Sequence, residues 1–190
     1  MIWLVIGIAV WCAVHFIPSL ARGFRARMID RFGEKQYKLA FALAILASVA
    51  LMVVGWRTAA FWDVYNPPEW GRPIASALIL IAFLLFALAH SPTNVKRVLR
   101  HPQLTGLIVW AIGHLLANGD ILSVVLFGGL GVWAVAEIVL INRREGAWVK
   151  PEPVPISAEI RPVLIGVLVF VAFFAAHPYL FGVSPMGDGG

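Results

Sequence analysis

The chain has 190 residues, of which 61% are hydrophobic and only 13% are charged. A water-soluble domain of this size cannot bury that much apolar surface, so the composition predicts a protein whose main partner is the lipid bilayer. The formal net charge is +5, but the basic residues fall between apolar runs rather than along one face, so nucleic acid is not an expected partner. The single cysteine, Cys12, excludes an intrachain disulfide and a thiolate metal site.

Six apolar runs follow one another along the chain, each bounded by charged, proline or glycine residues. They are Ile2–Leu20, Tyr37–Trp56, Pro73–His90, Leu104–Asn118, Ile121–Ile141 and Pro162–Phe181. A transmembrane helix needs about 20 mostly apolar residues. We therefore predict an all-α polytopic membrane bundle of about six transmembrane helices, with residues 1–190 in a single domain. The fourth run is the shortest, and we expect its helix to start earlier, near His101.

The first run resembles a secretory signal in length, but no positive charge precedes it and a cluster of arginines follows it. We therefore expect a retained first span. The basic residues also predict orientation, because 13 of the 15 lie on alternate connections. Those connections are Ala21–Gln36 together with Lys38, Ser91–Gln103 and Asn142–Arg161. The positive-inside rule places them in the cytoplasm and both termini outside it.

The chain has five histidines, and all lie within or beside the predicted spans: His15, His90, His101, His114 and His177. Ionisable groups there are costly unless they face a bundle interior, form a pair or bind a ligand. A neutral imidazole is a good iron ligand, so His15, His101, His114 and His177 are candidate cofactor ligands. Interhelical hydrogen bonding is the alternative for His15, and a helix cap or a lipid-phosphate contact is the alternative for His101. An interfacial position is favoured for His90.

Three other residues carry further predictions. Trp11 lies one turn before His15 on the same helix face. Gly113 removes a side chain beside His114, which allows either a flat ligand or another helix to approach. Glu137, within the fifth run, is predicted to form an ion pair with the arginines that follow it, and a proton relay is the alternative.

The expected depths of the histidines in the membrane can also be compared. Counted from the nearest predicted cytoplasmic arginine, His15 lies about 10 Å deep and His114 about 21 Å deep at 1.5 Å per residue. His177 lies about 24 Å deep by the same measure, which matches His114. Geometry along the membrane normal thus favours a pair of His114 and His177.

Three motifs in fixed order resemble the NnrU family across nearly the whole chain. They are Arg31-Phe-Gly33-Glu34-Lys-Gln-Tyr37-Lys38, Arg100-His101-Pro102-Gln103-Leu-Thr-Gly106, and Trp110 followed by His114-Leu-Leu-Ala-Asn118-Gly119-Asp120. Members of that family are multi-span bacterial inner-membrane proteins associated with nitrogen-oxide metabolism in denitrification. The same family includes the plastid 15-cis-zeta-carotene isomerase, an enzyme with haem b.

The resemblance implies haem b as cofactor, with His15 and His114 as the axial iron ligands. The isomerase has a cysteine three residues before the later histidine, where this chain has Ala111, so ligand exchange through that thiol is not expected here. Isomerase chemistry on an apolar substrate therefore does not follow from family likeness alone.

Three functions are open from the sequence. The first is a haem-b membrane protein of nitrite or nitric oxide metabolism, either an isomerase-type enzyme or a redox protein. The second is a transporter or assembly factor for nitrogen-oxide respiration without a cofactor. The third is a structural or regulatory membrane subunit.

Overall fold

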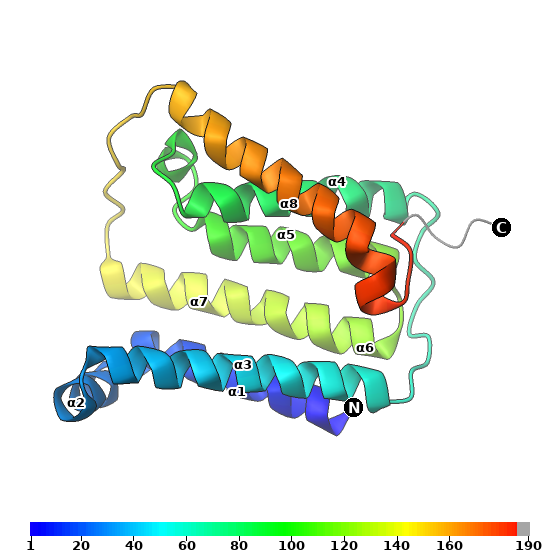
Figure 1. Ribbon diagram of the computed structural model, residues 1–190, viewed down its shortest axis with the longest axis horizontal. Helices are drawn as coiled ribbons and strands as arrows, with labels where there is room; N and C mark the ends of the chain where they lie inside the picture. Colours follow the sequence, from blue (N-terminus) through cyan, green and yellow to red (C-terminus); the bar gives the residue numbers. More distant parts are fainter. Residues whose placement is uncertain (186–190) are drawn as a thin grey trace. The chain divides into compact units, whose positions relative to one another are not determined.

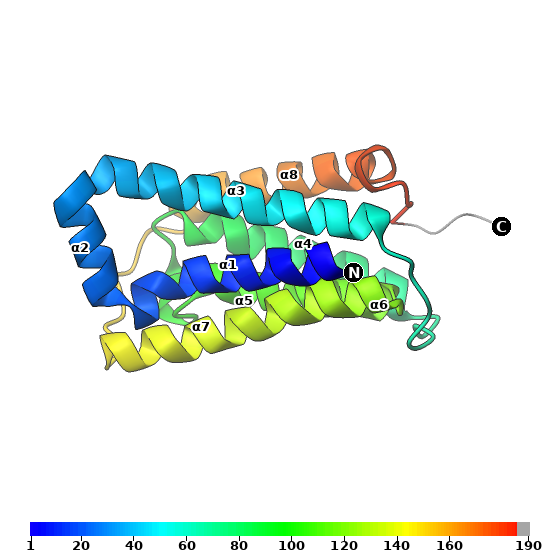
Figure 2. The ribbon, with the colours of Figure 1, turned by 90° about the horizontal axis from the view of Figure 1, so that it is seen from below.

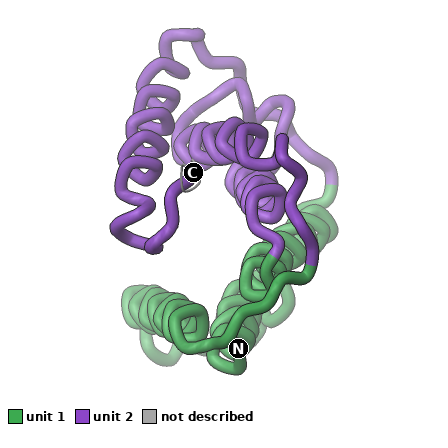
Figure 3. The backbone as a smooth tube through the Cα atoms, turned by 90° about the vertical axis from the view of Figure 1, so that its right-hand side faces the viewer, with its two compact units in different colours: residues 1–64, 120–146 green, residues 65–119, 147–190 purple. Residues whose placement is uncertain are grey.

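The structure is a computed structural model and describes residues 1–185. Within these residues the secondary structure is helical, apart from one isolated bridge between Asp63 and Asp120. The chain forms two compact units, each built from two segments of sequence (Figure 3). Unit 1 comprises Met1–Val64 and Asp120–Gly146, and unit 2 comprises Tyr65–Gly119 and the segment that begins at Ala147.

Unit 1 contains three long helical rods and one short helix. Its elements are α1 (Ile2–Leu20), α2 (Arg22–Phe32), α3 (Glu34–Thr58), α6 (Ile121–Ser123), a π-helical turn (Val124–Gly128) and α7 (Gly129–Glu145). The last three follow one another without a break and form one helical stretch. Helix α1 packs against α3 and against α7, and α2 crosses the end of the α1–α3 pair (Figure 2).

Unit 2 consists of α4 (Gly71–Ala89), a 3-10 turn (Asn94–Arg97), α5 (Pro102–Ala117) and α8 (Ser157–Phe181). Helix α4 packs closely against α5 and also contacts α8 (Figure 1). The proline-containing segment before α8 is not helical, because prolines there remove backbone donors. Glu159 at the start of α8 holds this end of the unit by accepting hydrogen bonds from Thr93 Oγ1 and the Asn94 backbone, both at 2.6 Å.

Five helical stretches in the described residues are long and apolar enough to cross a membrane: α1, α3, α4, the stretch Ile121–Glu145, and α8. Their large apolar side chains face outward, with Leu46 65% and Leu168 67% exposed, as lipid-facing positions require. The prediction of an all-α membrane bundle is confirmed. Helix α5 is apolar but has only 16 residues, about 24 Å at 1.5 Å per residue, so the sixth crossing stays a prediction.

Small residues bring the helices of unit 1 together. A Cβ atom at Gly55 of α3 would lie 2.1 Å from the backbone nitrogen of Leu4 in α1. A Cβ atom at Gly7 of α1 would lie 2.8 Å from the backbone oxygen of Ser48. With no hydrophobic effect between helices in lipid, such close backbone approach is the main source of packing energy.

One connection differs from the sequence predictions, and the start of one helix agrees with them. The basic connection after the first span is not a loop, because Arg22–Phe32 forms the helix α2, and Gly33 with a φ of 88° turns the chain into α3. Helix α5, the fourth predicted span, begins at Pro102 with His101 as its N-cap, as expected from proline at the first helical position.

Candidate functional site

His15 is half-buried in α1 and its ring has a defined tautomer. The Nδ1–H of His15 donates to the backbone carbonyl of Trp11 at 3.0 Å. A carbonyl oxygen can only accept, so the proton is on Nδ1 and the lone pair of the ring is on Nε2. This is the tautomer that a metal ligand needs when it binds through Nε2.

Three aromatic rings surround His15 within unit 1. The ring centroids of Trp11, Trp133 and Phe41 lie 4.2, 4.9 and 5.5 Å from that of the imidazole. Trp11 and Trp133 also meet each other edge to face at 5.6 Å. These rings come from α1, α3 and α7, so they fix the orientation of the imidazole from three helices.

Polar atoms without protein partners lie in the same cluster. The indole Nε1–H groups of Trp11 and Trp133 are buried and have no hydrogen-bond acceptor among the described residues. The Oε2 atom of Glu137, one turn after Trp133 on α7, is likewise buried without a donor there. Buried polar groups normally have a partner, so this cluster is suited to a bound group that supplies polar atoms.

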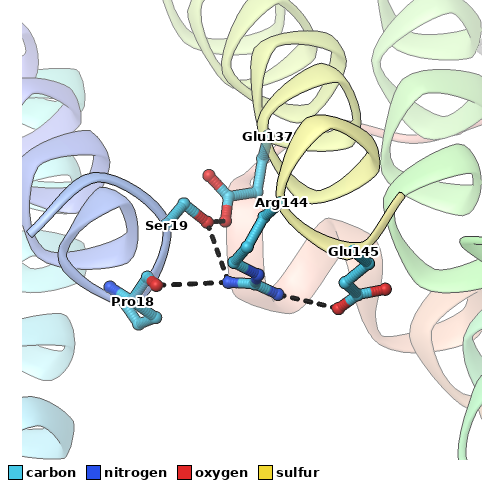
Figure 4. A network of polar contacts seen from close by, with 5 residues as sticks. All are labelled: Pro18, Ser19, Glu137, Arg144 and Glu145. Atoms are coloured by element: carbon cyan, nitrogen blue, oxygen red, sulfur yellow. Dashed lines mark hydrogen bonds and ion pairs between the residues drawn. The ribbon is translucent and has the colours of Figure 1, made fainter. Parts of the chain in front are cut away.

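Glu137 takes part in a short polar network, shown in Figure 4. It is only 7% exposed, and its Oε1 accepts a hydrogen bond from the hydroxyl of Ser19. Arg144 donates to the same Ser19 oxygen at 3.3 Å and to the Pro18 carbonyl at 3.2 Å. The predicted ion pair between Glu137 and the following arginines is therefore not direct. Ser19 lies between the two charges, and Arg144 pairs with Glu145 at 2.9 Å.

His114 repeats the arrangement of His15 in unit 2. Its Nδ1–H donates to the backbone carbonyl of Trp110 at 2.9 Å, and the two rings lie 4.6 Å apart. The lone pair of the ring is again on Nε2. Asn118, one turn after His114, donates through its side-chain amide to the His114 carbonyl at 2.9 Å. Trp-x-x-x-His therefore occurs twice in the chain, once in each unit, with the same local geometry.

Gly113 serves helix packing rather than the approach of a ligand. A Cβ atom at Gly113 would lie 3.3 Å from the Ala75 carbonyl and 3.2 Å from Ile79, both in α4. Of the two alternatives predicted for this glycine, the structure shows the close helix. Ala111, at the position of the isomerase cysteine, is also buried, with 3% exposure.

The remaining histidines occupy different surroundings. His177 in α8 donates from Nδ1 to the Val183 carbonyl at 2.8 Å. His101 is the half-buried N-cap of α5, and His90 is exposed at the end of α4. Within residues 1–185, no three histidine, cysteine or carboxylate side chains gather into a group that could hold a metal ion.

His15 and His114 thus have similar surroundings, each beside the tryptophan one turn earlier. Comparison with known proteins then identifies the family of the chain. The profile described as NnrU protein matches residues 3–185. The chain belongs to the NnrU family. No curated protein and no solved structure matches it. The match includes the helices of both units, so the family pattern covers the membrane bundle as a whole.

The NnrU motifs acquire structural roles in this chain. In the last motif, Gly119 passes close to the chain at Tyr65, where a Cβ atom would lie 1.9 Å from the Tyr65 carbonyl. Asp120 caps α6 by accepting hydrogen bonds from the backbone of Leu122 and Ser123, each at 3.0 Å. Asn118-Gly119-Asp120 is therefore a helix-to-helix connection, and His114 lies one turn before it on α5.

Proposed function

We propose that this NnrU protein binds haem b and acts in nitrogen-oxide metabolism at the bacterial inner membrane. The observation that carries the proposal is the repeated Trp-x-x-x-His geometry, in which His15 and His114 each donate from Nδ1 to a backbone carbonyl and so keep the lone pair on Nε2. Iron ligation by histidine uses such a nitrogen, held in orientation by the hydrogen bond of the other.

The surroundings of His15 suit a flat, largely apolar cofactor. Trp11, Trp133 and Phe41 give His15 an aromatic enclosure, and the two buried indole N–H groups there offer donors to a polar substituent. When bound, haem would supply an iron for ligand binding and electron transfer. The protein residues orient the imidazoles, keep water away with the rings and hold the ligand tautomer.

His114 is the ligand on which both lines of reasoning agree. The resemblance to the isomerase implies His15 as the second ligand, whereas depth and membership of unit 2 favour His177. Isomerase-type chemistry on an apolar substrate is one form that this function could take, and electron transfer to a nitrogen oxide is another.

An absorption spectrum tests the proposal. The full chain is expressed in haem-replete cells, purified in mild detergent and analysed for a Soret band and for the pyridine haemochrome of haem b. We expect haem in the wild type and a lower haem content in His114→Ala, because one of the histidines that would hold the haem is removed. Trp110→Phe is expected to keep the haem, since the acceptor for His114 is a backbone carbonyl.

His90→Ala is the matched control, because His90 is exposed and its ring is not part of a Trp-x-x-x-His pair. His15→Ala and His177→Ala identify the second ligand by conversion of a six-coordinate spectrum to a five-coordinate one. A wild-type protein that is colourless under these conditions would reject haem binding.

A further inference from the structure

Unit 1 contains a pocket of about 630 Å³ at the end of its long helices. Four basic side chains line it, together with Tyr37 and Phe41. The basic residues are Arg22, Arg25, Lys38 and Arg144. They come from α2, α3 and α7, so the pocket depends on the folded unit and not on one basic stretch of sequence.

The positive charge of this pocket is only partly balanced by the protein. Lys38 pairs with Glu34 at 2.8 Å, and Arg144 pairs with Glu145 at 2.9 Å. Within the described residues, Arg22 makes neither a hydrogen bond nor an ion pair through its side chain. The Arg25 guanidinium lies 5.5 Å from the centre of the Tyr37 ring, and the Glu34 carboxylate acts on it only from beyond ion-pair distance. Two cations of the pocket are thus available to an anion.

A second observation points to a ligand in the same place. The hydroxyl of Tyr37 is buried, and it has no hydrogen-bond partner in the part of the chain that the structure describes. Buried hydroxyls are rarely left in this state, because the lost hydrogen bonds to water cost free energy. An anionic oxygen held by the arginines would also accept a hydrogen bond from Tyr37.

The position of the pocket defines the kind of molecule that can reach it. Helix α1 ends at Leu20 and α3 begins at Glu34, so the basic residues lie where two spans leave the hydrocarbon core. Phe41, one turn further into α3 than Tyr37, extends the lining toward the apolar side. A ligand with an anionic head and an apolar body matches this order of side chains.

We propose that this pocket binds the phosphate group of an anionic phospholipid. Guanidinium groups of Arg22 and Arg25 donate paired hydrogen bonds to the phosphate oxygens, as arginine does at phosphate sites in general. Tyr37 donates a further hydrogen bond, and Phe41 contacts the start of an acyl chain. Basic pockets at the ends of transmembrane helices are suited to such head groups. This inference does not depend on haem binding.

Native mass spectrometry of the full chain tests it. Delipidated protein in mild detergent is incubated with phosphatidylglycerol or with phosphatidylcholine, and bound lipid is counted. We expect phosphatidylglycerol to be retained in preference to phosphatidylcholine, and Arg22→Gln/Arg25→Gln to weaken its binding by about tenfold or more, because two charge-assisted contacts are lost. Tyr37→Phe is expected to weaken binding several-fold while keeping the ring and the pocket shape.

Arg27→Gln is the matched control. Arg27 lies on the same helix and carries the same charge, but it is exposed and does not line the pocket. Retention of phosphatidylglycerol by the double variant and by Tyr37→Phe at the level of Arg27→Gln would overturn the proposal. Displacement of the lipid by millimolar inorganic phosphate would overturn the lipid assignment and identify the site as one for soluble phosphate compounds.

Discussion

Ser19 of α1 forms hydrogen bonds with two charged side chains of α7, Glu137 and Arg144. Its hydroxyl donates to the buried carboxylate of Glu137 and accepts from Arg144. A carboxylate at 7% exposure keeps its charge at low cost only while donors remain in place. Loss of the Ser19 hydroxyl is therefore expected to lower the stability of the protein, because it leaves the buried carboxylate without this donor.

We predict that Ser19→Ala destabilises the protein by about 1–3 kcal/mol, because the Glu137 carboxylate stays buried without its donor. Ser19→Ala/Glu137→Leu should recover part of this loss, since both partners are then removed. Thermal denaturation in detergent measures the effect. Ser76→Ala is the control, because Ser76 is a half-buried serine whose hydroxyl donates only to the Arg72 carbonyl of its own helix. Equal melting temperatures for Ser19→Ala and Ser76→Ala would contradict the prediction.

Asp120 gives a second prediction at the level of a single side chain. It accepts hydrogen bonds from the backbone of Leu122 and Ser123 and, at 2.6 Å, from the Ser123 hydroxyl. Asp120→Ala should lower stability by about 1 kcal/mol, the usual value of an N-cap. Asp120→Asn keeps an acceptor oxygen and should lose less in the same melting experiment. A loss of stability in Asp120→Asn as large as that in Asp120→Ala, or larger, would show that the charge of Asp120 matters and not its capping oxygen.

The surroundings of His15 were partly predictable. The spacing of four residues places Trp11 beside His15, and the structure confirms that contact. Trp133 and Phe41 were missed, because they lie on helices far away in sequence and no local pattern links them to His15. Trp133 and Glu137 are one turn apart on α7, and that spacing was the available sign that both face the same partner helix.

At the scale of elements, apolar length predicted the spans well. The run Ile2–Leu20 coincides with α1, and the other helices extend at most a few residues beyond the predicted runs, with Glu145 and Ser157 as the largest extensions. Helix α2 was not predicted, because a search for long apolar runs does not detect an 11-residue helix rich in arginine. The same arginines were assigned to topology alone, although the fold also brings two of them into a pocket with Tyr37.

The α1–α3 pair gives a prediction about an element. Gly55→Ala should destabilise unit 1 by about 1–3 kcal/mol, because its Cβ would meet the backbone of Leu4 and the helices would have to separate. Gly128→Ala is the control, since no atom lies within 4 Å of a Cβ atom there. Yield in the membrane fraction and the melting temperature are the measurements. Similar results for both variants would show that α1 and α3 are not held at the spacing described.

At the scale of the whole molecule, α5 decides the topology. If α5 crosses the membrane, the chain has six spans and the connection that includes Glu152 is cytoplasmic; with five spans, it is external. In a Cys12→Ser background, we predict that Asn66→Cys reacts with an impermeant maleimide on spheroplasts and that Glu152→Cys reacts only after lysis. Labelling of Glu152→Cys on intact spheroplasts would contradict six spans.

The division of unit 1 between two distant segments has a consequence for biosynthesis. Ser19 and His15 leave the ribosome early, whereas Glu137 and Trp133 follow only after α4 and α5 have been made. During that interval the α1–α3 hairpin presents its polar face without its final neighbour. A nascent chain stalled before residue 133 should therefore remain accessible to insertion chaperones, and release to full length should end that exposure.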